Sequence, residues 1–352
     1  MIGQMDLLIG GTALRAGALP VSGNSREFAG VRDSSWLTGR DSGRPGVRYN
    51  AGFMRSRPFA RNAAEYCLAA AVLKSLEYAP LPVAHALSRC YTRLLDRAIP
   101  RLRRVARRNL SLALPEYTPD RHAEIVDGLF RSIARMLVVF AKLPRIRRDN
   151  LDQWIRLEGG EHFETALRAG HGVLFATAHL GNWELSAFAH ALLAAPMSVL
   201  VRPLDNPYID ALVERRRALA GNVPIVKKDS ARAILKALAA NQAVGVLIDQ
   251  NATPTEGVFI DFFGIKACAG TGFAKLASHS GAAVIPGFAL WSEQEGRYVL
   301  RFYAPLPMSG DAAKDTQTLQ SRLEEVIREY PDQWLWIHRR WKTRPEGEPA
   351  IY

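Results

Sequence analysis

The chain has 352 residues, of which 48% are hydrophobic, so it can bury a sizeable core as one large α/β domain or two smaller ones. Its three cysteines (Cys67, Cys90 and Cys268) are far apart and form no C-x-x-C pair, which argues against a disulfide framework or a zinc site. A net charge of +12 points to an anionic partner, which could be nucleic acid, a membrane surface or an acidic protein. Neither H-E-x-x-H nor G-x-x-x-x-G-K-[ST] occurs, so we expect no metal and no nucleotide cofactor.

The first 56 residues differ in kind from the rest of the chain. They are rich in glycine, serine and arginine and show little sustained periodicity, so we expect disorder or only local structure there. An apolar patch at residues 7–9 is too short for the core of a secretory signal, and no charged segment precedes it. Met54 is an alternative start of the chain, so we interpret residues 1–56 as a leader outside the fold.

Residues 57–115 begin with a largely apolar segment at 63–87. Lys74 and Glu77 lie in its middle, and prolines follow at 80 and 82. A helix that spans a bilayer needs about 20 apolar residues with few charges, and this segment does not meet that requirement cleanly. We therefore predict a helix that lies in, or partly inserts into, a membrane interface. The alternative is a pair of helices packed on the core of the domain.

A basic stretch follows the apolar segment. Eight arginines and one aspartate lie between Arg89 and Arg108, and apolar residues between them suggest an amphipathic helix interrupted near Pro100. Such a stretch suits anionic lipid headgroups, and the alternative is a solvated helix face. Nucleic acid ranks below the other partners because no basic–aromatic repeat or known nucleic-acid-binding motif is present. We therefore predict a membrane-associated basic helical region over residues 57–115.

Strands and helices alternate in residues 116–345, which we interpret as one catalytic domain followed by a tail at 346–352. Alternation of this kind predicts a mainly parallel sheet with helices on both faces. The expected helices span residues 121–143, 161–168, 206–220, 230–240, 271–279 and 316–329. The expected strands span residues 173–178, 197–201, 224–226, 243–248 and 282–290, with an edge strand at 297–303.

The strand at residues 173–178 ends on His179, and Glu184 follows five positions later, where helical spacing begins. The pair therefore flanks a tight strand-to-helix turn at the carboxyl edge of the sheet, where open α/β sheets build their sites. With His179 in the loop and Glu184 in the first helical turn, the carboxylate can reach the imidazole. A carboxylate on one ring nitrogen makes the other a better base, which suits removal of a hydroxyl proton. A structural histidine is the alternative.

Three further side chains are candidates for the same site. Arg202 ends a strand, and its guanidinium could bind a phosphate or carboxylate, although it could instead pair at the surface with Asp205 or Asp210. Asp249 ends an apolar strand, where it could hold an arginine or contact an acceptor. Asn182 could shape the turn after His179 or offer a hydrogen-bond donor.

The segment from His179 to Glu184 (HLGNWE) resembles the H-x4-D/E signature of the glycerolipid acyltransferase superfamily. Residues 201–210 (VRPLDNPYID) resemble the R-P-x-D-N-P-x-x-D block of the bacterial late lipid A acyltransferases. An arginine run follows, in which Arg217 aligns with a functional arginine of that family. The next matching blocks are IDQ at 248–250, whose aspartate is Asp249, and DFFG at 261–264. With a further similar stretch at 103–116, the resemblance covers residues 60–345.

The resemblance implies an enzyme that moves a fatty acyl chain from acyl carrier protein or acyl-CoA to a hydroxyl of a lipid A precursor. It also implies a position at the cytoplasmic face of the inner membrane, because family members usually begin with a membrane-anchoring helix. Two alternatives are an acyltransferase for another glycolipid, such as a phosphatidylinositol mannoside, and a non-catalytic membrane-binding homologue. The implied site comprises His179 as general base with Glu184 as its partner, and Arg202, Arg217, Asp249 and Asn182 as substrate-binding residues.

Overall fold

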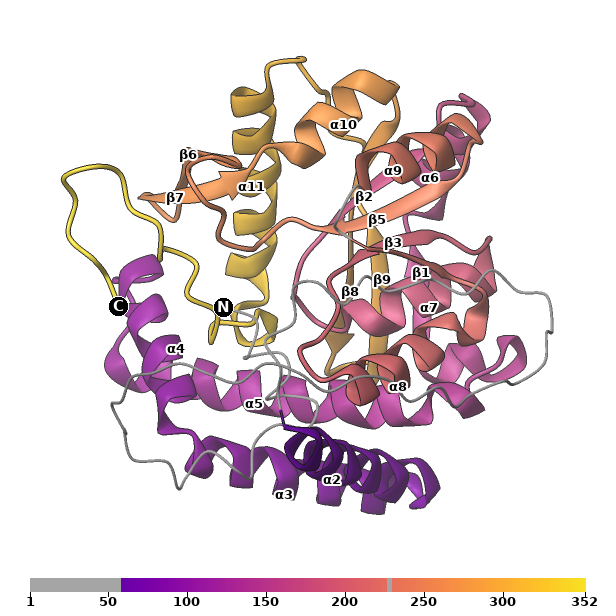
Figure 1. Cartoon of the computed structure of the whole chain (residues 1–352), viewed down its shortest axis with the longest axis vertical. Coiled ribbons are helices and arrows are strands. Elements are labelled where there is room, and N and C mark those ends of the chain that lie inside the picture. The colour runs from indigo at the N-terminus through magenta and orange to yellow at the C-terminus, as the bar shows by residue number, and fades with distance from the viewer. Residues whose placement is uncertain (1–57, 227–229) are drawn as a thin grey trace, which may run out of the picture.

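A computed structural model describes residues 58–226 and 230–352 of the chain (Figure 1), so the leader expected over residues 1–56 lies outside the described residues. A seven-stranded sheet with the order β1-β9-β8-β2-β5-β3-β4 forms its centre. Neighbouring strands are parallel except for β8 and β9. A mainly parallel sheet between helices confirms the fold class that the alternating pattern predicts.

The elements have the following bounds. The strands are β1 (Ile155–Glu158), β2 (Val173–Thr177), β3 (Ser198–Val201), β4 (Val223–Val226), β5 (Ala243–Leu247), β6 (Gly257–Phe262), β7 (Ile265–Gly270), β8 (Ala283–Ser292) and β9 (Arg297–Phe302). The α-helices are α2 (Phe59–Tyr78), α3 (Leu81–Ala98), α4 (Pro100–Ala113), α5 (Pro119–Lys142), α6 (Gly160–Arg168), α7 (Trp183–Leu193), α8 (Pro207–Arg217), α9 (Ser230–Ala239), α10 (Gly272–Ser280) and α11 (Ala312–Glu329). All twelve helices and strands expected after residue 115 are present, with ends shifted by a few residues.

The central strand β2 shows why these strands appear in the sequence as continuous apolar runs. Val173 and Phe175 pack into the cluster that includes α5, α6 and α7, whereas Leu174 and Ala176 pack into the cluster that includes α9 and α10. Successive side chains point to opposite faces of a strand, so a sheet covered on both faces needs apolar residues at every position. The loops after β2 and β5 are thereby held on a rigid support.

Helices α2, α3 and α4 lie along α5 at one side of the molecule (Figure 1). Helix α2 ends at Tyr78 and α3 begins at Leu81, so the prolines at 80 and 82 divide the apolar segment. Helix α4 begins at Pro100, where the sequence predicted an interruption of the basic helix. Leu73, Leu76 and Leu102 are at most 1% exposed within the same core cluster as α5 and the sheet. Residues 58–115 therefore pack into the same core as the sheet, with no packing boundary between them and the following described residues. Of the described helices, none is long and apolar enough to cross a membrane.

Buried polar contacts also connect α2 to the rest of the fold. Arg216 on α8 forms an ion pair with Glu77 at 2.7 Å, and both side chains are less than 10% exposed. Lys142, at the end of α5, donates to the Glu77 carbonyl at 2.8 Å, and Asn206 donates to the Asn62 carbonyl at 2.9 Å. Because one charge of a buried pair is costly without the other, α2 is part of the folded domain rather than a detachable anchor.

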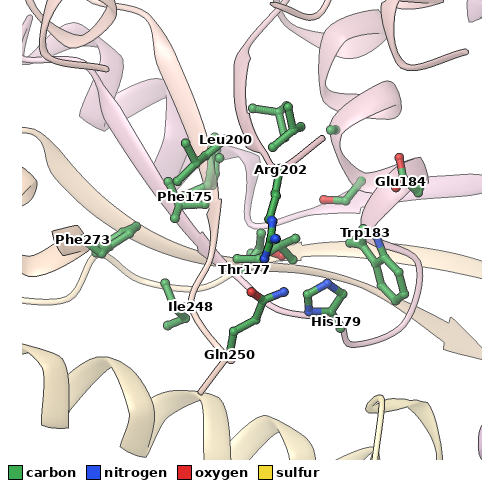
Figure 2. Close-up of a pocket in the computed structure, with 18 of the residues that line it drawn as sticks. Phe175, Thr177, His179, Trp183, Glu184, Leu200, Arg202, Ile248, Gln250 and Phe273 are labelled. Carbon is green, nitrogen blue, oxygen red and sulfur yellow. The ribbon is translucent and has the colours of Figure 1, made fainter. Parts of the chain in front are cut away.

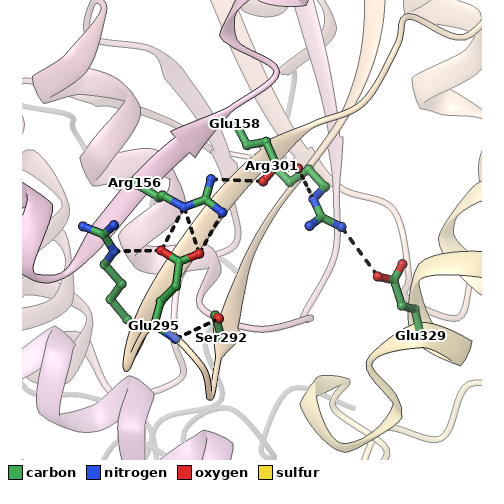
Figure 3. Close-up of polar contacts among 7 residues, drawn as sticks. Arg156, Glu158, Ser292, Glu295, Arg301 and Glu329 are labelled. Atoms are coloured by element: carbon green, nitrogen blue, oxygen red, sulfur yellow. Dashed lines mark hydrogen bonds and ion pairs between the residues drawn. The ribbon is translucent and has the colours of Figure 1, made fainter.

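The sheet differs from the sequence expectation at one edge. Residues 297–303 were expected to form the edge strand, but β9 lies between β8 and the short strand β1, which the sequence did not predict. Charged side chains cover this edge: Arg156 pairs with Glu295 at 2.7 Å and Arg301 with Glu158 at 2.8 Å (Figure 3). A charged edge strand discourages pairing with another chain.

The antiparallel hairpin of β6 and β7 was also not predicted. Its two-residue turn places Phe263 at φ 55° and Gly264 at φ 71°, so both residues are left-handed. Glycine adopts this region easily, but an aromatic residue rarely does, and the usual hairpin signal of Asn-Gly or Asp-Gly is absent. The structure supports the strained residue because the Phe263 ring stacks edge-on against Phe262 at 4.9 Å and the Phe263 N–H donates to Glu324.

Candidate active site

A cavity of about 720 Å³ opens beside the carboxyl ends of β2, β3 and β5. Its polar part contains His179, Glu184, Arg202 and Gln250, and its apolar part is lined by aromatic and aliphatic side chains of the sheet and helices (Figure 2). The apolar lining includes Phe175, Phe188, Met197, Val199, Leu200, Phe273 and Phe302. A concave site of this size with a few convergent polar groups is the usual form of a small-molecule site, and here it accommodates an apolar chain beside a polar head.

His179 is 6% exposed, and its ring contacts Asp249. Nδ1 lies 2.9 Å from Asp249 Oδ1, and the backbone N–H of His179 donates to Asp249 Oδ2 at 3.0 Å. The sequence assigned the partner role to Glu184, but in the structure Asp249 occupies it. A carboxylate at Nδ1 favours a proton on that nitrogen and leaves Nε2 as the basic one.

Asp249 is 3% exposed and still favours its charged form. Burial raises the pKa of the carboxyl, but the electrostatic attraction of His179, with hydrogen bonds from His179 and from Trp334, outweighs burial and holds the pKa well below its usual value. The indole Nε1–H of Trp334 donates to Asp249 Oδ2 at 3.0 Å. The sequence suggested that Asp249 holds an arginine or contacts an acceptor, whereas in the structure its two oxygens contact His179 and Trp334.

The turn after His179 depends on Gly181 and Asn182. Gly181 has φ 63°, and a Cβ at this position would lie 2.0 Å from the Ala289 carbonyl oxygen, so the backbone here leaves room only for glycine. Asn182 is fully buried and caps α7 by accepting the Leu185 N–H at 3.0 Å. Asn182 was expected as a substrate contact, whereas the structure places its side chain below the cavity surface, where it shapes the turn.

Glu184 lies in the first turn of α7, as predicted, but its carboxylate bonds to α8. Arg217 donates from Nε and Nη2 to the two Glu184 oxygens at 2.9 and 2.5 Å. Burial opposes the charge of Arg217, yet Glu184 raises its pKa above the usual value. Arg217 thus lines the cavity in a bidentate pair and does not lie on a solvated helix face.

Arg202 is an exposed cation that lines the cavity. Its side chain points towards Thr177, Gln250 and His179 (Figure 2). The pairing with Asp210 considered from the sequence does not form, because the Asp210 carboxylate accepts the Leu204 N–H instead. Within residues 58–226 and 230–352, Arg202 makes no hydrogen bond or ion pair, so its guanidinium is available to an anionic ligand.

The sequence did not single out several residues of the cavity. Trp183 lines the cavity, and its ring meets His179 edge-on at 4.9 Å between centroids. His338 also lines the cavity: its Nε2 accepts the Asn251 N–H at 3.1 Å, and burial lowers its pKa to about 4. His338 reaches the cavity from a segment 87 residues beyond Asn251, a contact that no local spacing reveals. In the described residues, no group of three histidine, cysteine or acidic side chains is placed to hold a metal ion.

Comparison with known proteins connects this geometry to a family. Residues 53–343 match the family model described as bacterial lipid A biosynthesis acyltransferase. The chain belongs to this family. It is 29% identical over 277 residues to the lipid A biosynthesis lauroyltransferase of Escherichia coli K12, covering 78% of this chain and 90% of the relative. It is also 29% identical over 268 residues to the palmitoleoyltransferase of the same organism, with coverage of 74% and 86%.

Another relative has a different acceptor in its name. The phosphatidylinositol mannoside acyltransferase of Mycolicibacterium smegmatis is 28% identical over 240 residues, covering 67% of this chain and 78% of the relative. Acyl transfer is the activity that these relatives share. The acyltransferase activity implied by the sequence motifs is therefore confirmed, and the chain is an enzyme of this class.

Proposed function

We propose that the enzyme transfers a fatty acyl chain from acyl carrier protein, or from acyl-CoA, to a hydroxyl of a lipid A precursor. The observation that supports this best is the His179–Asp249 pair at one wall of a largely apolar cavity, with the cation of Arg202 opposite. The pair supplies a base, the apolar lining suits an acyl chain, and the cation suits an acceptor that carries phosphate.

The chemistry follows from the free Nε2 of His179. Nε2 takes the proton of the acceptor hydroxyl, and the oxygen attacks the thioester carbonyl to form a tetrahedral oxyanion. The C–S bond then breaks, and the imidazolium returns its proton to the leaving thiolate. Arg202 would stabilise the oxyanion. No acyl-enzyme is required, and the chain has no G-x-S-x-G elbow to form one.

The two arginines of the site then have different roles. Arg217 is held by Glu184 through both carboxylate oxygens, so its charge is largely satisfied before substrate binds. Arg202 has no such partner in the described part of the chain and can bind a phosphate or a developing oxyanion directly. We assign substrate binding to Arg202. The Glu184–Arg217 pair instead positions α7 and α8 on either side of the cavity.

The surface of α2 to α4 supports a place at the membrane. Phe59 and Tyr78 are 73% and 64% exposed on α2, and Leu68 on α2 and Leu81 and Val83 at the start of α3 are further exposed apolar side chains. Exposed arginines follow on α3 and α4, namely Arg89, Arg93, Arg97, Arg101, Arg104, Arg107 and Arg108. Apolar side chains beside basic ones suit insertion among anionic headgroups. We therefore propose that the enzyme is peripheral to the cytoplasmic face of the inner membrane.

A glycolipid other than lipid A, such as a phosphatidylinositol mannoside, is the second candidate acceptor, favoured by the Mycolicibacterium relative. The test is transfer by the purified chain to a panel of both acceptor types from acyl carrier protein and CoA thioesters, followed by mass spectrometry of the products. Transfer to the lipid A precursor with loss in His179→Ala would support the proposal. Transfer only to the mannoside would replace the acceptor, and no transfer to either would favour a non-catalytic homologue.

A further inference from the structure

The loop that carries His179 is held from two sides. Asp249, which follows β5, contacts the ring and backbone of His179 from one side. On the other side, the segment Gln333–Leu335 pairs with the loop: the Gly181 N–H donates to the Gln333 carbonyl at 2.9 Å, and the Leu335 N–H donates to the His179 carbonyl at 3.0 Å. This segment therefore lies against the reacting group although it follows His179 by more than 150 residues.

Trp334, at the centre of that segment, also contacts Asp249 directly. Its Nε1–H donates to Asp249 Oδ2 at 3.0 Å, the same oxygen that accepts the His179 backbone N–H. With two donors on Oδ2, the carboxylate plane is fixed and Oδ1 is directed at Nδ1 of His179. Without the indole, only the backbone N–H and Nδ1 of His179 would contact the carboxylate, and no group outside the His179 loop, in the part of the chain that the structure describes, would orient it.

The indole itself has little freedom to move. Trp334 is 1% exposed, and its ring meets Trp336 edge-on at 4.6 Å and Phe262 at 5.8 Å between centroids. Gln333 fixes the adjacent backbone, because its side-chain amide accepts the Trp291 N–H at 2.8 Å and donates to the Trp291 carbonyl at 3.0 Å. A donor held this rigidly imposes its geometry on the carboxylate that it contacts.

We infer that Trp334 is a positioning residue that fixes the Asp249 carboxylate and thereby keeps His179 in the tautomer with the proton on Nδ1. A neutral imidazole has two tautomers, and only the one with a bare Nε2 can take a proton from a hydroxyl in the cavity. Without the indole donor, Asp249 would hold Nδ1–H less firmly and the Nε2–H tautomer would gain population. This inference rests on the proposed role of His179 as the general base.

Trp334→Phe tests the inference because it keeps an aromatic ring and removes the donor. Trp336→Phe is the matched control: Trp336 is also buried in this cluster and its Nε1–H also donates one hydrogen bond, at 2.6 Å to the Pro331 carbonyl, away from Asp249. The readouts are steady-state kinetics and the tautomer of His179 from imidazole ¹⁵N NMR, with the resonances assigned by comparison with His179→Gln. The tautomer readout needs no turnover, so it separates failure of this inference from failure of the proposed function.

For Trp334→Phe, we expect kcat to fall roughly 10- to 100-fold at unchanged KM, because about one hydrogen bond to a charged group is lost. We also expect the Nε2–H tautomer of His179 to become detectable by NMR. Trp336→Phe should keep both the tautomer and kcat, and Trp334→Phe should cost nothing further in an Asp249→Asn background. If Trp334→Phe unfolds the protein, the test uses a different variant. In this variant, position 334 carries an isosteric tryptophan analogue in which sulfur replaces the indole N–H. A wild-type tautomer and kcat in the donor-less variant, or equal losses in both tryptophan variants, would overturn the inference.

Discussion

Glu184 lies five residues after His179 but bonds to Arg217 on a different helix, with both carboxylate oxygens accepting guanidinium hydrogen bonds at 2.9 and 2.5 Å. His179 meets Asp249 instead, 70 residues away in the chain. The acidic residue of the H-x4-E pattern therefore pairs with α8 at the wall of the cavity, and the imidazole of His179 contacts a carboxylate that follows the neighbouring strand β5. This division of roles determines what each substitution should change.

Substitutions of the two acidic residues should separate their roles. Asp249→Asn keeps the shape of the side chain but removes the charge that holds Nδ1–H, and we expect kcat to fall about 10²- to 10⁴-fold, close to the effect of His179→Ala. Glu184→Gln leaves the His179–Asp249 contact intact and should cost kcat markedly less. Steady-state kinetics on the three variants decides between the carboxylates, and a larger loss for Glu184→Gln than for Asp249→Asn would return the orienting role to Glu184.

The Glu184–Arg217 pair should matter more for stability. Its side chains are 10% and 21% exposed, so removal of one partner leaves a poorly solvated charge. We expect Glu184→Gln or Arg217→Gln to lower the free energy of unfolding by about 2–4 kcal/mol, and the double variant to lose less than the sum of the two. Urea denaturation of the four proteins in this cycle measures the coupling. Additive losses would mean that the two side chains contribute independently.

Arg202 should act on acceptor binding. Arg202→Ala removes an unpaired cation that lines the cavity and should raise the KM for a phosphorylated acceptor by roughly 10- to 100-fold, the cost of about one charge-assisted contact. Arg202→Lys should recover only part of this loss, because an ammonium cannot bind two phosphate oxygens as a guanidinium does. Kinetics with acceptor varied at saturating donor provide the measurement. If KM stays unchanged and only kcat falls, Arg202 stabilises the oxyanion and does not hold the acceptor.

Stability should fall in mild acid because two histidines are buried in neutral form. Burial lowers the pKa of His190 and of His338 from 6.5 to about 4. Below pH 6.5 the unfolded chain binds protons that the folded protein does not, so the stabilisation present above pH 6.5 is lost as the pH falls towards 4. Each histidine contributes a slope of about 1.4 kcal/mol per pH unit within that window. Urea unfolding of wild type and His190→Phe from pH 7 to 4 tests this, and identical slopes would contradict it.

Membrane binding should depend on surface side chains of α2 and α4. Leu68→Glu places a charge on the exposed face of α2 and should weaken binding to anionic vesicles by about 10- to 100-fold, the cost of not burying one leucine. Leu157→Glu is a matched control, because Leu157 on β1 has the same 37% exposure. Replacement of Arg104 and Arg107 by Gln should weaken binding at low salt and matter less at high salt, where headgroup attraction is screened. Equal effects of both leucine variants would reject α2 as the membrane face.

Local patterns in the sequence were enough for the elements that carry the site. The apolar run before His179 and the helical spacing after Glu184 predicted β2, the turn and α7 correctly, because period and turn chemistry are properties of adjacent residues. The alternation of such units also predicted a mainly parallel sheet. The short strand β1 and the left-handed Phe263 turn escaped prediction because contacts from other segments, and not local propensity, stabilise them.

Which side chains contact one another at the site depends on the tertiary structure. Strands β2 and β5 pair in parallel register from Val173 opposite Ala243 to Thr177 opposite Leu247, so the residues that follow both strands emerge side by side, and His179 meets Asp249 there. Trp334 reaches the same carboxylate from a segment 85 residues further along the chain. Local sequence patterns were enough to predict that a histidine and several charged residues end strands at one edge of a sheet. Strand order and the packing of the C-terminal segment determined their partners, because both depend on contacts between residues that no spacing along the chain relates.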